Sequence, residues 1–205
     1  STIPGNDNFY LTGGTALSYF YLKHRKSNDL DFFTNEEALI VPFSLRLEEF
    51  MKKRSLSIEK QRSFSSFVEL LLKKDKETTI IHLAQDAAFR LEPCKQTTEF
   101  PNLKIDSLVD IASNKLLTLF ARAMLRDFID IYFLVKKGNF TTENLMEKAK
   151  VKDSGFDLYW LGVALERINT FNCDSAEMLL LVEPVEFNEL VDFFNQWRKK
   201  IAKSM

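Results

Sequence analysis

FYLTGGTALSYFYLKHRKSNDLDFFT, residues 9–34, is the stretch of sequence that decides the fold. Its first three residues are β-prone, and the glycine pair Gly13 and Gly14 ends that run. From Thr15 onward the apolar residues recur at helical spacing. After a basic run, polar and apolar residues alternate through residues 29–33, as they do in a half-buried strand. The stretch therefore predicts a strand, a glycine turn, a helix and a second strand.

A helix whose first turn is rich in glycine suits a phosphate group. The backbone N–H groups of that turn have no partner within the helix, and no side chain covers them. The helix dipole is also positive at this end. We therefore expect Gly13 and Gly14 to bind phosphate, with Thr15 adding a hydroxyl.

Asp29 and Asp31 stand two residues apart at the start of the second strand. Side chains at i and i+2 of a strand share a face, so the two carboxylates project together while Leu30 and Phe32 face the core. Adjacent carboxylates repel each other unless a cation lies between them. Mg²⁺ is bound by one or two carboxylates together with substrate phosphates. The pair predicts a Mg²⁺ (or Mn²⁺) site, and the alternative is a surface strand with two exposed acids.

Two segments of this stretch and a third further on carry a resemblance to a known family: GGTAL at 13–17, HRKSNDLDFF at 24–33 and RDFIDIY at 126–132. Together they resemble the AbiEii/AbiGii toxin family of nucleotidyltransferases, a branch of the polymerase-β-like superfamily found in abortive-infection and toxin–antitoxin systems. The resemblance covers residues 9–134. It implies an α+β fold, with a nucleotidyltransferase core built on a mixed sheet of about five strands flanked by helices, followed by a C-terminal helical subdomain.

The resemblance also implies which further residues bind the nucleotide. Arg25 and Ser27 belong to the first motif. Asp106 and Ser107 form an N-cap signal for a long helix on which basic side chains are spaced seven and four residues apart. If that helix is continuous, the cations share one side and hold a triphosphate, while nearby aspartates orient them. The alternative is a surface salt-bridge ladder of little energetic value. The residues concerned are Lys115, Arg122, Arg126, Asp127 and Asp130.

His82 stands where the family has a third carboxylate. The related stretch reads apolar-apolar-Asp-apolar, and here residues 80–83 read IIHL. Imidazole can act as a general base, but it is a poorer Mg²⁺ ligand than a carboxylate. Glu69 and Asp86 are candidate substitutes for the missing acid. The alternative is that His82 is a buried, hydrogen-bonded histidine with no catalytic part.

The rest of the chain supports this arrangement of a core and helices. We expect a helix at 42–54, ended by basic residues, and strands at 57–62, 66–72 and 78–84, with one more short strand at 103–105. Gly138 should end the long helix. Helices are then expected at 142–150, 157–169 and 184–203. These elements predict two domains, a nucleotidyltransferase core at 1–105 and a helical subdomain at 106–205.

Composition limits the partners. The formal net charge is −1, so the chain lacks the basic field of a protein that coats nucleic acid, and any RNA contact must be local. Basic runs at 23–26, 52–54 and 198–200 are possible contact sites, although a solvated helix or turn face is the favoured interpretation of each. Cys94 and Cys173 are far apart in the sequence, so we expect both to be free thiols in a reducing compartment. With no apolar run long enough to span a bilayer and no signal peptide, we expect a cytoplasmic protein without a membrane partner.

These observations favour a metal-dependent nucleotidyltransferase. It would transfer a nucleotidyl group from a nucleoside triphosphate (NTP) to an acceptor hydroxyl. The resemblance implies that the acceptor could be tRNA and that the protein could be the toxin of a pair with a cognate antitoxin. The alternative is a degenerate member that binds nucleotide, RNA or protein without catalysis, which His82 favours and the acid pair opposes. A kinase-like phosphotransferase is a third interpretation.

Overall fold

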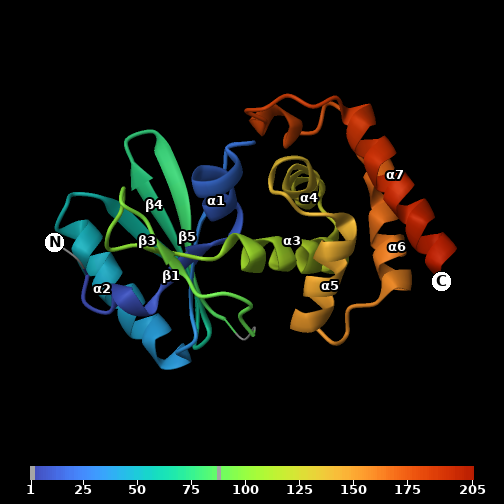
Figure 1. Ribbon diagram of the computed structural model, residues 1–205. Helices are drawn as coiled ribbons and strands as arrows, with labels where there is room; N and C mark the ends of the chain where they lie inside the picture. The colour runs from blue at the N-terminus through green and yellow to red at the C-terminus, as the bar shows by residue number, and fades with distance from the viewer. Residues whose placement is uncertain (1–2, 87–88) are drawn as a thin grey trace. The chain divides into compact units, whose positions relative to one another are not determined.

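The computed structural model describes residues 3–86 and 89–205 of the chain. Its contacts divide the chain into two compact units (Figure 1). The first, here the sheet unit, comprises Ser1–Leu17 and Ser27–Ser107. The second, the helical unit, comprises Ser18–Lys26 and Leu108–Met205. The short segment Ser18–Lys26 therefore groups with helices that come much later in the sequence. Whether 1–105 and 106–205 fold as independent domains stays a prediction.

The sheet unit is built on a seven-stranded mixed sheet in the order β3-β4-β5-β2-β1-β7-β6. Strands β2 and β5, and β1 and β7, pair in parallel, and the other neighbours pair antiparallel. The α+β class is confirmed. The sheet has more than the predicted number of about five strands: β7 is the short strand expected at 103–105, whereas β6, only two residues long, was not predicted. The strands are β1 Tyr10–Thr12, β2 Leu30–Thr34, β3 Ser57–Phe64, β4 Phe67–Lys74, β5 Glu77–Gln85, β6 Lys95–Gln96 and β7 Lys104–Ile105.

One face of this sheet packs against helix α2 (Ile40–Lys52), as Figure 1 shows. Short 3₁₀ turns at Asn6–Asn8 and Glu37–Leu39 precede β1 and α2. Because side chains alternate along a strand, Leu30 and Phe32 of β2 pack on this core. The fully or nearly buried members of the core are Phe9, Ile40, Phe43, Leu47, Ile58, Val68, Leu70, Ile81 and Leu83.

The opposite face of the sheet carries a row of polar residues. Thr12 of β1 pairs with Asp31 of β2, and Asp31 pairs with His82 of β5. His82 in turn pairs with Glu69 of β4, and Glu69 pairs with Arg62 of β3. Strand pairing alone thus aligns these side chains across the sheet, on the face that α2 leaves uncovered.

The helical unit consists of five main helices. They are α3 Leu108–Arg122, α4 Leu125–Lys137, α5 Thr142–Lys152, α6 Leu158–Glu166 and α7 Phe187–Ser204. Gly138 caps the end of α4, as the sequence predicted. Thr141 caps α5, because its side chain accepts a hydrogen bond from the backbone amide of Asn144. Asp157 caps α6 in the same way by accepting one from the amide of Trp160. Apolar faces of α4, α6 and α7 supply buried Phe128, Leu161, Leu165, Phe194 and Trp197.

Short 3₁₀ turns occupy Arg167–Thr170, which extends α6, and Met178–Leu180, which lies in the connection to α7. None of the helices in the described ranges is long and apolar enough to cross a bilayer. Cys94 and Cys173 are free thiols, as predicted.

The expectation of one continuous helix through residues 106–126 is wrong. The chain breaks between α3 and α4, where Ala123 has a φ of 46° and Met124 is extended. The break contains neither glycine nor proline, so the helical periodicity hides it. The Asp127 carboxylate accepts the backbone N–H of Met124 at 3.2 Å and so caps a new helix. Arg126 consequently lies on α4, whereas Lys115 and Arg122 lie on α3.

Candidate functional site

The glycine turn follows β1 directly. Gly13 opens helix α1 (Gly13–Ala16), which continues as a π-helical segment, Leu17–Leu22. The φ of Gly13 is +72°, in the region that favours glycine, and a Cβ added there would lie 2.1 Å from Asp31 Oδ2. Both the backbone conformation and the neighbouring carboxylate therefore require glycine at this position.

The first turn of α1 has no side-chain cap among the described residues. Thr12 stands at the N-cap position, but its hydroxyl donates to Asp106 Oδ2 at 2.6 Å instead. The Thr12 side chain therefore does not cover the amides of this turn, the part of a helix at which phosphate groups bind.

Thr15 joins the glycine turn to the acid pair. Its hydroxyl donates to the backbone carbonyl of Asp29 and lies 3.0 Å from the Ser27 hydroxyl. These contacts hold the chain ahead of β2 against α1. The structure thus brings Gly13, Thr15, Ser27 and the acids together, as the sequence predicted, although the Thr15 hydroxyl is engaged with the protein itself.

Asp31 lies between the glycine turn and His82. Its Oδ1 accepts a hydrogen bond from His82 Nδ1 at 2.8 Å, while its Oδ2 is the atom next to Gly13. A quarter of the Asp31 side chain is exposed, at 25%. Asp29 lies close enough that its charge, like that of Asp31, acts on His82.

His82 lies between two carboxylates. Besides the Asp31 contact, its Nε2 is 3.4 Å from Glu69 Oε2, and the other Glu69 oxygen is 3.5 Å from Arg62 Nε. The hydrogen bond to Asp31 is the main cause that raises the pKa of His82, against an opposing effect of burial. His82 is thus held by two acids and remains 22% exposed. Asp86, the other candidate substitute, lies elsewhere and accepts a hydrogen bond from the Tyr10 hydroxyl.

The donor set fits a hard divalent cation that completes its shell with substrate. Among residues 3–86 and 89–205, no group of three or more His, Cys, Asp or Glu side chains is arranged to hold a metal ion. Asp31 offers a carboxylate oxygen beside the glycine turn, and Asp29 precedes it by two residues. Mg²⁺ is commonly held by one or two carboxylates, with phosphates and water as the remaining ligands, so two acids suffice.

In the helical unit, three basic side chains contact the carboxylate of Asp130. It is fully buried and accepts from His24 Nε2 at 2.8 Å, from Arg25 Nε at 2.7 Å and from Lys115 Nζ at 2.7 Å. Burial alone would raise the pKa of Asp130, but Lys115, His24 and Arg25 together hold it well below its usual range. Burial lowers the pKa of His24, against the opposing effect of its hydrogen bond to Asp130.

Arg122 forms a second pair with buried Asp127. Arg122 Nε and Nη2 each donate to the Asp127 carboxylate at 2.9 Å. Cations oriented by aspartates were predicted and are present. Arg126 differs, because its Nε is buried and has no hydrogen-bond partner in the described part of the chain. That these residues bind a nucleotide stays a prediction.

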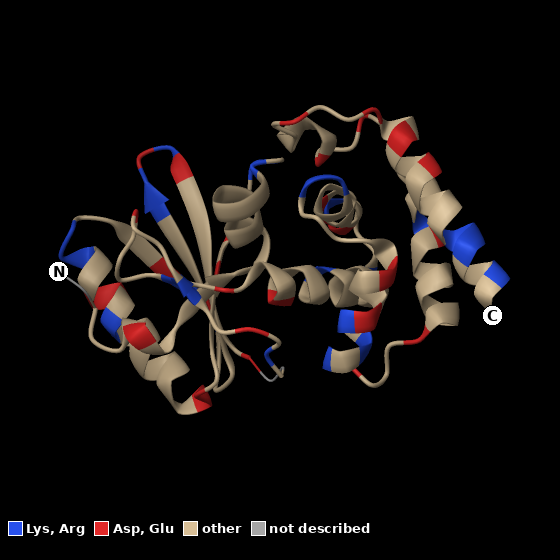
Figure 2. Cartoon of the chain, in the orientation of Figure 1, with Lys and Arg blue, Asp and Glu red and all other residues tan. Residues whose placement is uncertain are grey.

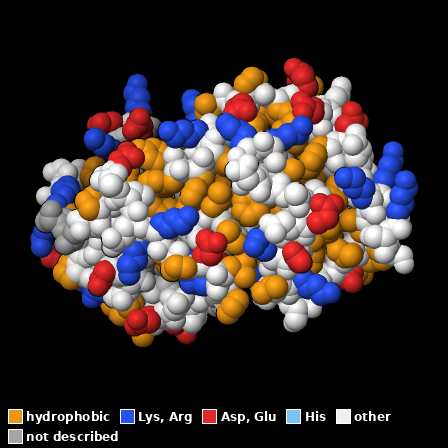
Figure 3. Space-filling model, viewed as in Figure 1, with side chains coloured by type: hydrophobic (Ala, Val, Ile, Leu, Met, Phe, Trp, Pro, Cys, Tyr) orange, Lys and Arg blue, Asp and Glu red, His pale blue; other side chains and the backbone are white. Residues whose placement is uncertain are grey.

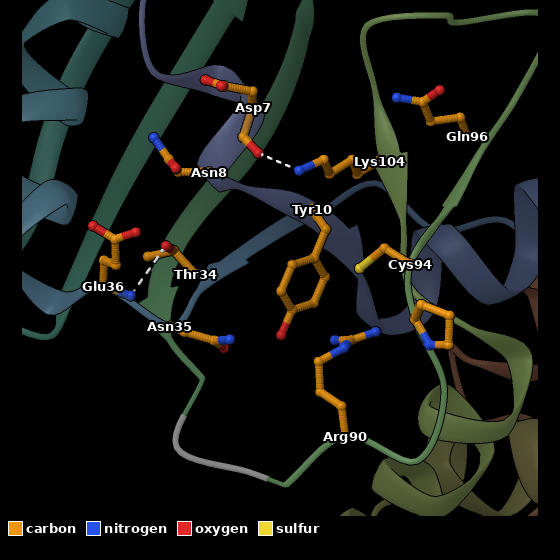
Figure 4. A pocket seen from close by; sticks show the side chains of 11 residues that line it. Asp7, Asn8, Tyr10, Thr34, Asn35, Glu36, Arg90, Cys94, Gln96 and Lys104 are labelled. Atoms are coloured by element: carbon orange, nitrogen blue, oxygen red, sulfur yellow. Dashed lines mark hydrogen bonds between the residues drawn. The ribbon is translucent and has the colours of Figure 1, made fainter.

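A separate cavity of about 660 Å³ lies in the sheet unit, beside the Tyr10 end of β1 (Figure 4). Arg90 lies over the Tyr10 ring, 4.4 Å from its centroid, and donates to Asp106 at 2.7 Å. Lys104 and Cys94 line the same cavity. None of the residues that the sequence singled out for chemistry lines it. Asp106 connects this cavity to β1, because its carboxylate accepts hydrogen bonds from both Arg90 and Thr12. The sequence predicts Asp106 only as a helix cap and gives no sign of these contacts.

A mixed sheet with a glycine turn against Asp31, followed by helices, is the arrangement that the resemblance to nucleotidyltransferases predicts. Residues 1–203 match the model of the family described as nucleotidyl transferase AbiEii toxin, Type IV TA system, and the chain belongs to this family. Its members are toxins of toxin–antitoxin systems, so an antitoxin partner is expected for this chain.

Individual proteins resemble this chain over most of its length. An uncharacterized protein of Aquifex aeolicus, aq_aa25, is 29% identical over 97% of this chain and 90% of that protein. Three solved structures share the fold. JHP933 of Helicobacter pylori has a TM-score of 0.56 at 20% identity, over 96% of this chain and 84% of that one. A putative nucleotidyltransferase of H. pylori has a TM-score of 0.57 at 18% identity, over 97% and 89%. MenT4, a nucleotidyltransferase toxin of Mycobacterium tuberculosis, has a TM-score of 0.53 at 13% identity, over 94% and 76%.

Proposed function

We propose that this protein is an active, metal-dependent nucleotidyltransferase toxin that uses an NTP. The observation that carries the proposal is the position of Asp31, whose Oδ2 lies against Gly13 at the head of an uncapped helix. Phosphate on the turn amides and Mg²⁺ or Mn²⁺ on the acids would then be neighbours.

The residues divide the work as follows. Gly13, Gly14 and Thr15 seat the phosphates, and Asp29 with Asp31 holds the cation, which when bound neutralises phosphate charge. The acceptor oxygen forms a bond to the α-phosphorus, the bond from that phosphorus to the pyrophosphate oxygen breaks, and the hydroxyl proton passes to solvent. Positioning and charge neutralisation supply most of the rate enhancement in such transfers.

In the helical unit, Arg126 is the best candidate for a phosphate ligand. Its Nε is buried and has no partner among the described residues, and a guanidinium fits phosphate geometry well. Arg25, Lys115 and Arg122 are already engaged with Asp130 and Asp127. For these three, a phosphate would have to share a donor with an aspartate.

We infer that the acceptor is an RNA, with tRNA as the first candidate. Acidic and basic side chains are interspersed on the face shown in Figure 3, so an RNA contact must be local. The second half of α7 supplies one, because no acid follows Asp192 and Figure 2 shows basic residues there. Tyr159 and Trp160, at the start of α6, are 56% and 60% exposed.

These two regions lie together within the helical unit. Glu166 pairs with Arg198, and Asn169 bonds Asn195, so α6 and α7 run antiparallel and the start of α6 lies beside the end of α7. Exposed aromatic rings beside lysines are a common means of binding unpaired bases.

A degenerate member without catalysis is the second candidate, and His82 in place of the third carboxylate favours it. A kinase-like phosphotransferase is the third. The test is transfer of label from each of four α-³²P-labelled NTPs to total tRNA with Mg²⁺, comparing wild type with the double variant Asp29→Ala/Asp31→Ala. Label that the double variant and EDTA abolish supports the proposal. Label from γ-³²P alone indicates a kinase, and no transfer by protein that still binds Mg²⁺–NTP supports the degenerate alternative.

A further inference from the structure

The orientation of Asp31 is fixed from one side. Its Oδ1 accepts from His82 Nδ1 at 2.8 Å, and this contact leaves Oδ2 as the oxygen beside Gly13. A carboxylate free to rotate would present either oxygen to the glycine turn, whereas this one presents Oδ2.

His82 is itself fixed from two sides. Its Nε2 lies 3.4 Å from Glu69 Oε2, and the Phe67 ring packs beside the imidazole, with ring centroids 5.5 Å apart. Glu69 is only 15% exposed, and its second oxygen lies 3.5 Å from Arg62. Asp31, His82, Glu69 and Arg62 therefore form a row across four paired strands, in which each side chain contacts the next.

In this row the imidazole bridges two acids that would otherwise repel each other. The arrangement differs from that of a third metal-ligating carboxylate, because both ring nitrogens are directed at acids. It also differs from that of a free general base, which needs an unoccupied nitrogen facing the substrate.

Resting on the proposed function, we propose that His82 is a positioning residue, held by Glu69, that turns Asp31 Oδ2 toward the glycine turn. His82 takes no proton from the acceptor and holds no metal. Hydrogen-bond partners that orient a metal ligand commonly change metal affinity by about 10- to 100-fold when they are removed.

The test measures binding rather than turnover. Dissociation constants for Mg²⁺ with the α,β-methylene analogues of four NTPs are determined by titration calorimetry, and the analogue that binds tightest is used. His82→Ala should weaken binding by about 10- to 100-fold. His82→Asn should restore most of the loss, because an asparagine amide can donate to Asp31 much as Nδ1 does. In turnover, the Mg²⁺ requirement should rise more than kcat falls.

A double-mutant cycle tests the part played by Glu69. Glu69→Gln should weaken binding in the wild-type background and have no further effect in His82→Ala, since Glu69 acts through the imidazole. Glu59→Gln, an exposed acid of β3 that lies 3.8 Å from Lys73, is the matched control and should change nothing. Thermal unfolding of each variant separates lost binding from lost folding.

Three results would overturn the inference. One is an equal effect of Glu69→Gln in both backgrounds, which would make Glu69 a direct ligand. A second is tighter binding in His82→Asp, which would show that residue 82 occupies a ligand position. The third is the absence of any effect of His82→Ala. The proposed function is tested separately by Asp31→Asn. If Asp31→Asn still binds Mg²⁺–nucleotide as wild type does, the proposed site is wrong, whereas loss there with no effect of His82→Ala rejects the positioning role alone.

Discussion

Gly13 is the residue on which the candidate site depends most directly. Its φ of +72° and the 2.1 Å that would separate an added Cβ from Asp31 Oδ2 both exclude a larger residue. The position thus couples backbone geometry to the location of a carboxylate. A glycine in a turn is ordinarily replaceable at a modest cost, but here the replacement would also displace an acid.

Gly13→Ala should therefore lower both stability and Mg²⁺–nucleotide affinity. The left-handed conformation alone costs an L-residue about 1–2 kcal/mol. Gly162→Ala is the control, because a Cβ at Gly162 meets nothing within 4 Å and alanine favours the helix. Urea unfolding and calorimetric titration of the two variants check this. Equal stability of both variants would argue against the close contact with Asp31.

The two histidines should give opposite pH dependences of stability. Burial lowers the pKa of His24, so its contribution is present above the unfolded pKa of about 6.5 and is lost as pH falls through the folded pKa. Asp31 raises the pKa of His82, so its contribution is present below about 6.5 and is lost as pH rises through the folded pKa. A pKa that differs by about 1 between the folded and unfolded states corresponds to about 1.4 kcal/mol of stability.

Urea unfolding between pH 5 and 8 can separate the two effects. In His82→Asn only the contribution of His24 remains, and stability should fall as the pH drops below about 6.5. In His24→Gln the slope should reverse, because His82 then acts alone. Parallel profiles for the two variants would contradict these assignments.

The resemblance puts a site residue on a strand beside the acid pair, and His82 does lie next to Asp31; that Asp29 and Asp31 act together stays a prediction. The sequence does not predict the row from Asp31 to Arg62. That row depends on the register of β3, β4 and β5, which turn geometry sets and one residue of slippage would reverse. The sequence indicates Glu69 as a candidate site residue, whereas nothing in the sequence singles out Arg62.

At the scale of elements, the break between α3 and α4 decides where the cations lie. Lys115 contacts Asp130 and Arg122 contacts Asp127, so each basic residue of α3 pairs with an acid of α4. The predicted alignment of three cations on one helix is replaced by pairs between two helices. Only the capping role of Asp127, three residues after Met124, carries a signal for the break in the sequence.

Asp127→Ala should destabilise the helical unit more than the loss of an ordinary cap. Removing one partner of a buried ion pair costs about 3–5 kcal/mol. Because the Arg122 side chain is 43% exposed and solvent screens the pair, we expect the lost ion pair to lower the free energy of unfolding by about half of that amount. The lost helix cap should lower it by about 1 kcal/mol more. Asp157→Ala, which removes only the cap of α6, is the control and should cost about 1 kcal/mol. Equal losses in urea unfolding would show that the Arg122 contact contributes nothing.

At the scale of the whole molecule, the sequence predicts the order of elements but not the membership of Ser18–Lys26. A domain boundary at 105/106 is suggested by the change from strands to helices, and the compact units change at Ser107 as well. The early segment joins the helical unit through His24, Arg25 and Asp130. Such a contact between residues so far apart in sequence leaves no local pattern to detect.

A fragment of residues 106–205 should therefore fold poorly on its own. Asp130 would lose His24 and Arg25 and keep only Lys115 as a cation partner. We expect no cooperative thermal transition by circular dichroism, and partial recovery when a peptide of residues 18–26 is added in excess. A fragment that unfolds cooperatively without the peptide would support the division into two domains at 105/106.

The contact between His24 and Asp130, which spans 106 residues, has a consequence in time. Ribosomes add about 5–20 residues each second, so roughly 5–20 seconds separate the synthesis of the two partners. During that interval the sheet unit can form, while the side chains of His24 and Arg25 remain solvated because Asp130 has not yet been synthesised. The helical unit cannot close before Asp130 has been synthesised, so the early segment stays without its buried partner throughout that interval.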